Sequence, residues 1–526
     1  MPDYIFMLES RLSPEQLEVL NRVQQEAQDL SLNLYLVGGA VRDLMTGSLI
    51  RDLDFAAEGN PSRLVRRLQA GGARRVVTDE RRNSTEMVLA NGVSLSLSMA
   101  RNDIFRAPGK PPDVRPASIM DDLRRRDFSL NAMGISLTPG SRGLLLDPTN
   151  GLADIDSRQL RILHNYSFLH DPVRLLRLVR YSSRLGFRPD ERTRELFEAA
   201  LERGYQDYIE PRQVGAEAEQ IAQEDNAVAV LKALAEHELL AVFHPMLQKR
   251  APDYDGLAKL QKYRRQAVDA GYRVDSLAIA LHYIRRRLPS RAQNALLRNL
   301  ALDKRRLQEV LQLEAEARRL AQQLGRQRSL GPRQIFHLLE NVPVERLVFI
   351  LAEYSDKQKI QYKIYNYLFK YRPMLKRLPV RELQLMGVPP GPKFQETLDK
   401  FFEAMLDGKL RGRPQQLRLL RKLAGLPKPK PEPKPKKPAG KKPAKGEAAP
   451  AEAEAKPAPV PPPAHPPAPA APPGKKPAAA EKTPAAPAKK SPARVSAKPA
   501  KAKKPKKPKK PAKPKPKKKP TKKRRR

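Results

Sequence analysis

The sequence predicts an α+β protein of several domains, in which a mixed α/β unit precedes a long all-helical part and a disordered C-terminal extension. The chain has 526 residues, which exceeds one typical domain. Short apolar segments alternate with helical patterns up to about residue 150, and helical periodicity then dominates to about residue 425. The remainder is rich in Lys, Pro and Ala and has almost no large apolar residues. The expected regions are 1–150, 151–250, 251–426 and 427–526.

Within the first region, the apolar pattern predicts a short series of strands and helices. Helices are expected over 14–30, 41–46 and 64–69, and strands over 34–37, 53–56, 75–78, 86–89 and 93–99. Asn91-Gly92 is a hairpin turn signal between the last two strands. In the helical part, long helices are expected over 169–185, 192–203 and 212–235.

The charge of the chain favours a polyanionic partner. The formal net charge is +44, and residues 427–526 hold 33 Lys and Arg against 5 Asp and Glu, a net charge of +28. The rest of the chain is also basic, with 68 Lys and Arg against 52 Asp and Glu. We expect the extension to contact RNA non-specifically through phosphates, while a solvated spacer is the alternative.

Several classes of protein are excluded or disfavoured by composition. The chain has no cysteine, so disulfides, thiolate catalysis and cysteine-based zinc sites are excluded. The first residues lack the basic and apolar segments of a secretory signal, and no apolar run reaches the ~18–20 residues that span a bilayer. We therefore expect a cytoplasmic protein with no membrane partner.

Two aspartates, Asp52 and Asp54, are the candidate catalytic and metal-binding residues. They are two residues apart on an expected strand, so both side chains point to one face. Paired carboxylates suit Mg²⁺, which shares its oxygen ligands with substrate phosphates. A D-x-D pair alone also fits a solvated loop.

The segment "YLVGGAVRD" adds a candidate phosphate-binding turn. Gly38 and Gly39 follow an apolar strand, and without side chains their backbone N–H groups can approach a triphosphate. Arg42 would offer a forked donor to phosphate oxygens. An ordinary strand-to-helix turn is the alternative, but the combination with D-x-D shortly afterwards is more specific.

Two arginine-rich segments complete the candidate nucleotide site. In "DLRRRDFSLNAMGI", Arg126, with Arg125 as a second candidate, would contact the nucleotide, and Asp127 its ribose. In "HDPVRLLRLVRYSSRLGF", Asp171, Arg174 and Arg177 form one polar arc that could bind the edge of a base, and Arg180 lies about half a turn away. A charged helix start and a salt-bridged amphipathic helix are the structural alternatives.

These segments, in this order and spacing, resemble the class II tRNA nucleotidyltransferase and bacterial poly(A) polymerase family over residues 33 to 245. The resemblance implies a DNA-polymerase-β-like head, then an all-α neck, body and tail, and template-independent addition of nucleotides to RNA 3′ ends. It implies that Asp52 and Asp54 hold Mg²⁺ and that Asp171, Arg174, Arg177 and Arg180 select ATP or CTP. The matching nucleotide-binding positions of the earlier motifs are Gly38, Gly39, Arg42, Asp43, Arg125, Arg126 and Asp127.

Three positions depart from the family pattern. Ser96 stands where many relatives have a third carboxylate, and His170 stands where an acidic residue usually precedes the Asp-Pro pair. "LAIALHYIRRR" is similar to the His-Asp segment of members with a phosphohydrolase domain, but Tyr283 replaces the Asp, so no metal hydrolase is expected.

The leading hypothesis is CCA addition to tRNA from CTP and ATP. The alternatives are an A-adding enzyme or poly(A) polymerase that uses ATP only, and an inactive RNA-binding homologue. The segment "LMGVPPGPKFQETLDKFFEAMLDGKLRGR" resembles the tail that grips tRNA in many bacterial members.

Overall fold

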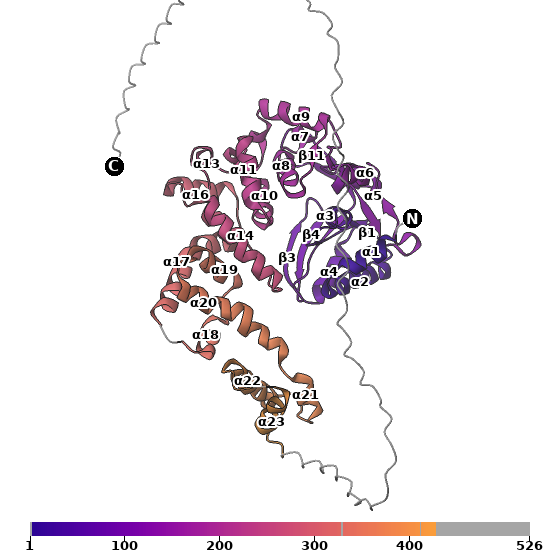
Figure 1. The fold of residues 1–526 in the computed structure, drawn as a ribbon. Helices are drawn as coiled ribbons and strands as arrows, with labels where there is room; N and C mark the ends of the chain where they lie inside the picture. Colours follow the sequence, from indigo (N-terminus) through magenta and orange to yellow (C-terminus); the bar gives the residue numbers. More distant parts are fainter. Residues whose placement is uncertain (1–2, 328–329, 411, 428–526) are drawn as a thin grey trace, which may run out of the picture. The chain divides into compact units, whose positions relative to one another are not determined.

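The computed structural model of the chain describes residues 3–327, 330–410 and 412–427, all within one compact unit. Figure 1 shows the head at the N-terminal end of this unit, followed by a long series of helices. The expected α/β head and a mostly helical remainder are therefore confirmed, although the expected all-helical character is broken by one short pair of strands. The extension expected to be disordered lies, after Pro427, outside the described residues.

A seven-stranded mixed sheet forms the centre of the head, in the order β3-β4-β5-β2-β1-β8-β9. Strand β2 pairs antiparallel with β1 and parallel with β5. The strand before the two glycines and the strand that contains Asp54 are therefore neighbours in the middle of the sheet. The strands are β1 (Asn33–Val37), β2 (Leu53–Glu58), β3 (Ala73–Asp79), β4 (Ser84–Leu89), β5 (Ser94–Met99), β8 (Gly134–Ser136) and β9 (Leu145–Leu146). A separate hairpin pairs β6 (Arg101–Ile104) with β7 (Asp113–Pro116).

The helices of the head cover the sheet with apolar faces. The longest of them begins at a capping box in which Ser13 and Gln16 satisfy each other's backbone N–H groups, and Pro14 fits its first turn. Its buried side chains include Val19, Leu20 and Val23. Figure 1 shows α1, α2 and α4 beside the strands. The helices are α1 (Tyr4–Arg11), α2 (Pro14–Asp29), α3 (Gly39–Met45), α4 (Ser62–Ala70) and α5 (Ile119–Arg124).

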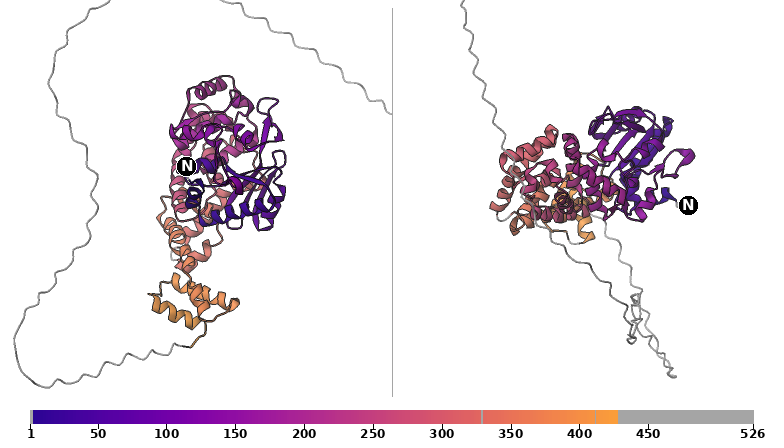
Figure 2. Two further views of the ribbon diagram at one scale, coloured as in Figure 1. Left: turned by 90° about the vertical axis from the view of Figure 1, so that its right-hand side faces the viewer. Right: turned by 90° about the horizontal axis from the view of Figure 1, so that it is seen from above.

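Beyond the head, the described part of the chain is helical apart from the short parallel pair β10 (Gln159–Leu160) and β11 (Arg188–Pro189). Both views of Figure 2 show this segment, coloured from magenta to orange, as helices. The first group is α6 (Gly151–Asp156), α7 (Ser167–His170), α8 (Arg174–Leu185), α9 (Glu191–Glu202), α10 (Pro211–Gln223), α11 (Ala227–Glu236), α12 (Leu240–Phe243) and α13 (Met246–Lys249). The second is α14 (Tyr254–Asp269), α15 (Leu277–Arg285), α16 (Ser290–Asn299), α17 (Lys304–Arg326), α18 (Pro332–Leu339), α19 (Val344–Glu353), α20 (Gln358–Asn366), α21 (Val380–Leu385), α22 (Pro392–Leu406) and α23 (Arg413–Leu423).

Two expected helices are each broken in two, and the expectation of continuous helices was wrong there. The helix expected over 169–185 breaks at Asp171, whose backbone is not helical (φ −134°, ψ 80°), because the following Pro172 disfavours the helical conformation of the residue before it. The helix expected over 212–235 breaks at Glu224, and Asn226 begins the next helix by accepting a hydrogen bond from the Ala229 N–H group.

One hydrophobic core runs from the head into the helical part. It includes Phe55 of β2, Phe128 after α5 and Leu175 of α8, each with no exposed surface. Burial of such side chains contributes ~1.5–3 kcal/mol each. A second cluster lies in the last helices, around Leu383, Phe401 and Leu420. In the part of the chain that the structure describes, no helix is long and apolar enough to cross a membrane.

Gly215 lets α10 lie directly against the end of α16. A Cβ atom at this glycine would lie 2.0 Å from the backbone oxygen of Leu300, which no side chain rotation can relieve. Gly325, in α17, has no atom within 4 Å of the same position.

We predict that Gly215→Ala lowers the free energy of unfolding by about 1–3 kcal/mol, because the added methyl group forces two helix backbones apart. Gly325→Ala is the control and should be neutral or stabilising by up to about 1 kcal/mol, since alanine favours helix more than glycine does. Denaturant unfolding of both variants checks this, and equal stability of the two would contradict it.

Candidate active site

The two-glycine turn between β1 and α3 lies against an acidic and a basic side chain. Gly38 has φ +66°, a conformation that glycine adopts without strain. A Cβ atom at Gly38 would lie 2.7 Å from Nη1 of Arg126, and one at Gly39 would lie 3.3 Å from Oδ2 of Asp54. Gly38 is thus favoured by its conformation, and the bare backbone of both glycines lies within reach of both charges.

The expected carboxylate pair lies at the start of β2. Asp54 is directly opposite Ser96 of β5, whose hydroxyl donates a 2.7 Å hydrogen bond to Asp54 Oδ1. Asp52 has exposed surface, yet protein atoms crowd its carboxylate, and this desolvation, together with the charge of Asp54, raises its pKa to about 6. Arg51 opposes the shift without cancelling it.

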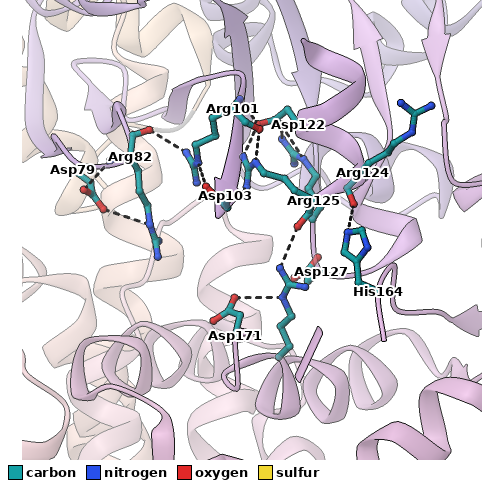
Figure 3. Close-up of polar contacts among 12 residues, drawn as sticks. Asp79, Arg82, Arg101, Asp103, Asp122, Arg124, Arg125, Asp127, His164 and Asp171 are labelled. Carbon is teal, nitrogen blue, oxygen red and sulfur yellow. Dashed lines mark hydrogen bonds and ion pairs between the residues drawn. The ribbon is translucent and has the colours of Figure 1, made fainter. Parts of the chain in front are cut away.

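Arg125 and Arg126 are both held by one buried carboxylate, that of Asp122. Figure 3 shows Arg125 beside Asp122 and Asp103. Arg126 donates to Asp122 Oδ2 at 2.8 Å, and Arg125 also donates to Asp103 of the β6–β7 hairpin at 2.9 Å. Burial would raise the pKa of Asp122, but Arg126 and Arg125 hold it below its usual value. The position of Arg126 beside the glycine turn therefore depends on Asp122.

Arg42 lies beneath the turn within a buried network. Its guanidinium donates to Asp43 Oδ1 at 2.9 Å and to Asn131 Oδ1 at 2.7 Å, and it lies over the Tyr181 ring. Asp43 in turn accepts a 2.8 Å hydrogen bond from Arg184. In this structure the guanidinium of Arg42 donates to protein acceptors. Phosphate binding by Arg42 and nucleotide binding by Asp43 therefore stay predictions.

Asp171 lies in the break between α7 and α8, and the first turns of α8 bring two arginines to it. The nitrogen-to-oxygen distances to Asp171 Oδ2 are 3.4 Å from Arg174 and 3.9 Å from Arg177. Arg174 also donates to the backbone oxygen of Arg125, at 3.2 Å, and so contacts the head. Arg177 also pairs with Asp127, at 3.4 Å. The expected arc is therefore a real cluster.

Asp127 holds two of these segments together. Its carboxylate accepts hydrogen bonds from the Asn131 side-chain amide and from the backbone N–H group of Phe128. Burial would raise its pKa, but Arg177 and Arg174 hold it below the usual value, so the group is ionised at neutral pH.

Comparisons with known proteins find relatives of this chain. Residues 34–161 match the model described as the poly A polymerase head domain. Over the head, this chain is therefore similar to the tRNA nucleotidyltransferase and bacterial poly(A) polymerase family. An A-adding tRNA nucleotidyltransferase of Geobacter sulfurreducens is 24% identical over 428 residues, which cover 80% of this chain and 48% of that protein.

Another A-adding tRNA nucleotidyltransferase, of Halalkalibacterium halodurans, is 38% identical over 192 residues, covering 36% of this chain and 45% of that protein. The chain therefore spans about half the length of these curated relatives. A solved CCA-adding enzyme in an apo form is 25% identical, with a TM-score of 0.45, and the match covers 81% of this chain and 99% of that one.

Within this family framework, the two departures at Ser96 and His170 have defined surroundings. Ser96 offers Asp54 a hydroxyl in place of another charge. The His170 ring stacks on Phe105, which follows β6, with the ring centroids 5.0 Å apart and the planes 10° apart. Burial and the nearby Arg174 lower the pKa of His170, so its neutral form stacks at neutral pH.

The carboxylates that bind Arg177 and Arg180 were not identified from the sequence. Glu217 of α10 accepts from Arg177 and Arg180, each at 2.9 Å, and Glu224 lies 3.1 Å from Arg180. Burial would lower the pKa of Arg180, but Glu217 and its neighbours raise it. Arg180 thus lies in the interior and is the one residue of the expected set that does not contact Asp171. The sequence did contain one indication of these ion pairs. Glu217 and Glu224 are seven residues apart, as are Arg177 and Arg184, so matching charges recur at the same helical spacing.

The carboxylates of Asp52 and Asp54 fit a divalent cation. Both are hard oxygen ligands, and a cation between them would remove the repulsion that raises the pKa of Asp52. No cluster of three or more His, Cys, Asp or Glu side chains forms a metal site within the described ranges. Substrate phosphate oxygens and water would complete the coordination shell.

We predict that Asp52 titrates near pH 6 in the metal-free protein and that Asp54→Asn lowers its pKa, because the variant removes the neighbouring charge. Carbon-13 NMR of labelled aspartate measures both, and Asp113→Asn, a change on the β6–β7 hairpin, is the control.

The same shift has a consequence for stability. The pKa of Asp52 is about 6 in the folded protein and ~3.9 in the unfolded chain. The protonated side chain therefore contributes its full stability below pH ~3.9, and this contribution is lost as the pH rises through about 6. Asp52→Asn should therefore stabilise the metal-free protein increasingly between these pH values. A constant difference across the range would contradict the assignment.

Proposed function

We propose that this chain adds nucleotides to the 3′ end of tRNA and builds CCA from CTP and ATP. The single observation that carries the proposal is the convergence of the bare Gly38-Gly39 backbone, the Asp54 carboxylate and the Arg126 guanidinium on one place. A triphosphate needs all three: close backbone approach, a metal-binding carboxylate and a forked cation. The named relatives, which are tRNA nucleotidyltransferases, supply the class of substrate.

The reaction joins the RNA 3′ oxygen to the α-phosphorus of the incoming nucleotide, and the bond to pyrophosphate breaks. Asp52 and Asp54 would hold Mg²⁺, which when bound favours ionisation of the attacking hydroxyl and neutralises the leaving pyrophosphate. The glycine turn admits the triphosphate, and Arg126, held by Asp122, meets its negative charge. Asp127 lies beside Arg177 and would bind the ribose.

Base choice is proposed for Asp171, Arg174 and Arg177. The carboxylate accepts hydrogen bonds from an exocyclic amino group, while guanidinium groups donate to ring or carbonyl acceptors. Glu217 fixes Arg177 and the Gln213 amide fixes Asp171, at 2.9 Å each, so these groups are held before a nucleotide arrives. Fixed protein groups could thus do the work that a template strand does in a polymerase.

An A-adding enzyme is the second candidate, and one observation favours it. Both relatives described above carry that name, and the Geobacter protein matches most of the described part of this chain. Such an enzyme would use ATP on tRNA that already ends in CC. The basic extension, residues 427–526, is proposed to strengthen RNA binding through its net charge of +28 in either case.

The first test uses tRNA transcripts that end before CCA, after C and after CC, each incubated with CTP, ATP or both. We expect C, C and then A to be added to the shortest transcript. Addition of A alone, and only to the CC-ended transcript, would make this an A-adding enzyme. Asp54→Ala should reduce incorporation by ~10³-fold or more, because a metal ligand is lost, while Asp356→Ala, an exposed carboxylate in the turn between α19 and α20, should not. Equal incorporation by both variants would remove the proposal.

The second test addresses base choice. Asp171→Ala is expected to change the ratio of kcat/KM for CTP and ATP by about tenfold or more, since one hydrogen-bonding partner of the base is lost. Glu198→Ala, an exposed change on α9, is the control. A fall in both rates at an unchanged ratio would mean that Asp171 only supports the fold, and the unfolding midpoint of each variant is measured alongside.

A further inference from the structure

A polar cavity of about 220 Å³ lies among the helices of the second group, in a segment that the proposed reaction does not use. Its volume far exceeds the ~10–15 Å³ that one water requires. It lies among α15, α16, α17 and α19 and is lined by His282, Arg285, Arg286, Gln293, Glu314 and Glu353. Three of these side chains, those of His282, Arg285 and Arg286, come from the "LAIALHYIRRR" segment, whose chemistry the proposed function leaves unexplained.

Arg285 brings to this cavity a positive charge that forms no ion pair with a described carboxylate. Its Nη1 donates to the neutral Gln293 amide oxygen at 2.6 Å, and its Nε is buried without a hydrogen-bond partner. In the described part of the chain, no carboxylate lies within 4 Å of its guanidinium. Burial lowers the pKa of Arg285, and the charge of Glu314 opposes this shift without cancelling it.

His282 adds a second unpartnered polar atom. The residue is only 6% exposed, and its ring lies edge-on against Tyr283 and Phe349, with centroids 5.1 Å and 4.9 Å away. Its Nδ1 lies 3.8 Å from Glu314 Oε2, while Nε2 is buried with no partner. A buried polar atom left unpaired costs ~1–3 kcal/mol, which a ligand in the cavity would recover.

The two glutamates of the lining already have cationic partners. Glu353 pairs with Arg286 at 3.1 Å, and Glu314 pairs with Arg318 at 2.7 Å, one turn along α17. Their charges are therefore compensated, and the charge of Arg285 remains. A metal ion is disfavoured, because the arginines would repel it and no cluster of three metal-binding side chains occurs in the described segments.

We propose that this cavity is an oxyanion site that binds a phosphate group through the Arg285 guanidinium and the His282 Nε2–H group. Arg285 offers the forked geometry that suits phosphate, and the fixed His282 ring directs a second donor from the preceding turn of α15. Two sources share this chemistry: free inorganic phosphate and a phosphodiester of a bound RNA backbone. The free-phosphate case is independent of the proposed function, whereas the RNA case rests on it.

The test is hydrogen exchange of the full chain, with inorganic phosphate titrated at constant ionic strength. Saturable protection is expected in α15 and α17, and these peptides are distinct from the head, where phosphate could also bind. Arg285→Gln should weaken this protection by about tenfold or more, because a charge-assisted hydrogen bond is lost, and Arg285→Lys should weaken it less. Arg287→Gln is the matched control, since this neighbouring arginine is 52% exposed and pairs with Asp253 outside the cavity.

The source of the phosphate follows from a second arm with a tRNA transcript and no nucleotide. If RNA supplies it, tRNA displaces inorganic phosphate from α15, and Arg285→Gln reduces the salt slope of tRNA binding by about one. If the ligand is free phosphate, both bind together and the slope is unchanged. The proposal is overturned if α15 and α17 show the same protection in the native chain, in Arg285→Gln and in His282→Gln. This comparison is made with inorganic phosphate and with tRNA. Nucleotide incorporation is measured separately, so failure of the enzyme function remains distinguishable.

Discussion

The arrangement of the candidate site depends on one row of arginine–carboxylate pairs along α8. Arg177 joins Asp127 of the head to Glu217 of α10, Arg180 joins Glu217 to Glu224, and Arg184 joins Asp43 beneath the glycine turn. Buried pairs of this kind add little net stability, because desolvation offsets their attraction, but breaking one leaves an uncompensated charge that costs ~3–5 kcal/mol. Their main effect is therefore geometric: α8 can take one position against the head.

The sheet supplies the other half of the site by bringing sequence-distant residues into register. The parallel pairing of β2 with β5 places Ser96 opposite Asp54, and the antiparallel pairing of β1 with β2 places the glycine turn next to that carboxylate. The strands are buried at these positions, so a shift of one residue would move apolar side chains out of the core. The chemistry thus depends on a register that packing enforces.

The parts of this arrangement that were predictable from sequence are those set by local pattern. The head strands over 34–37, 53–56, 86–89 and 93–99 were found because apolar alternation and turn residues define them over a few positions. The short strands β6 to β9 were missed, since their two to four residues carry too little pattern. The grouping of Asp52 with Asp54 and of Asp171 with Arg174 followed from spacing alone. The roles of Asp122, Glu217 and Glu224 did not, because the arginine that each carboxylate meets is decided by tertiary packing.

The β6–β7 hairpin is attached at both ends. Its base is tied to Arg125 through Asp103, while Phe105 stacks on His170 and a Cβ atom at Gly109 would lie 2.3 Å from the backbone oxygen of Tyr208. A hairpin held only at its base can move as a rigid body, but a hairpin held at its base and at its tip cannot. Any change in the separation of Arg125 from His170 and Tyr208 must then deform this hairpin or break one of its contacts.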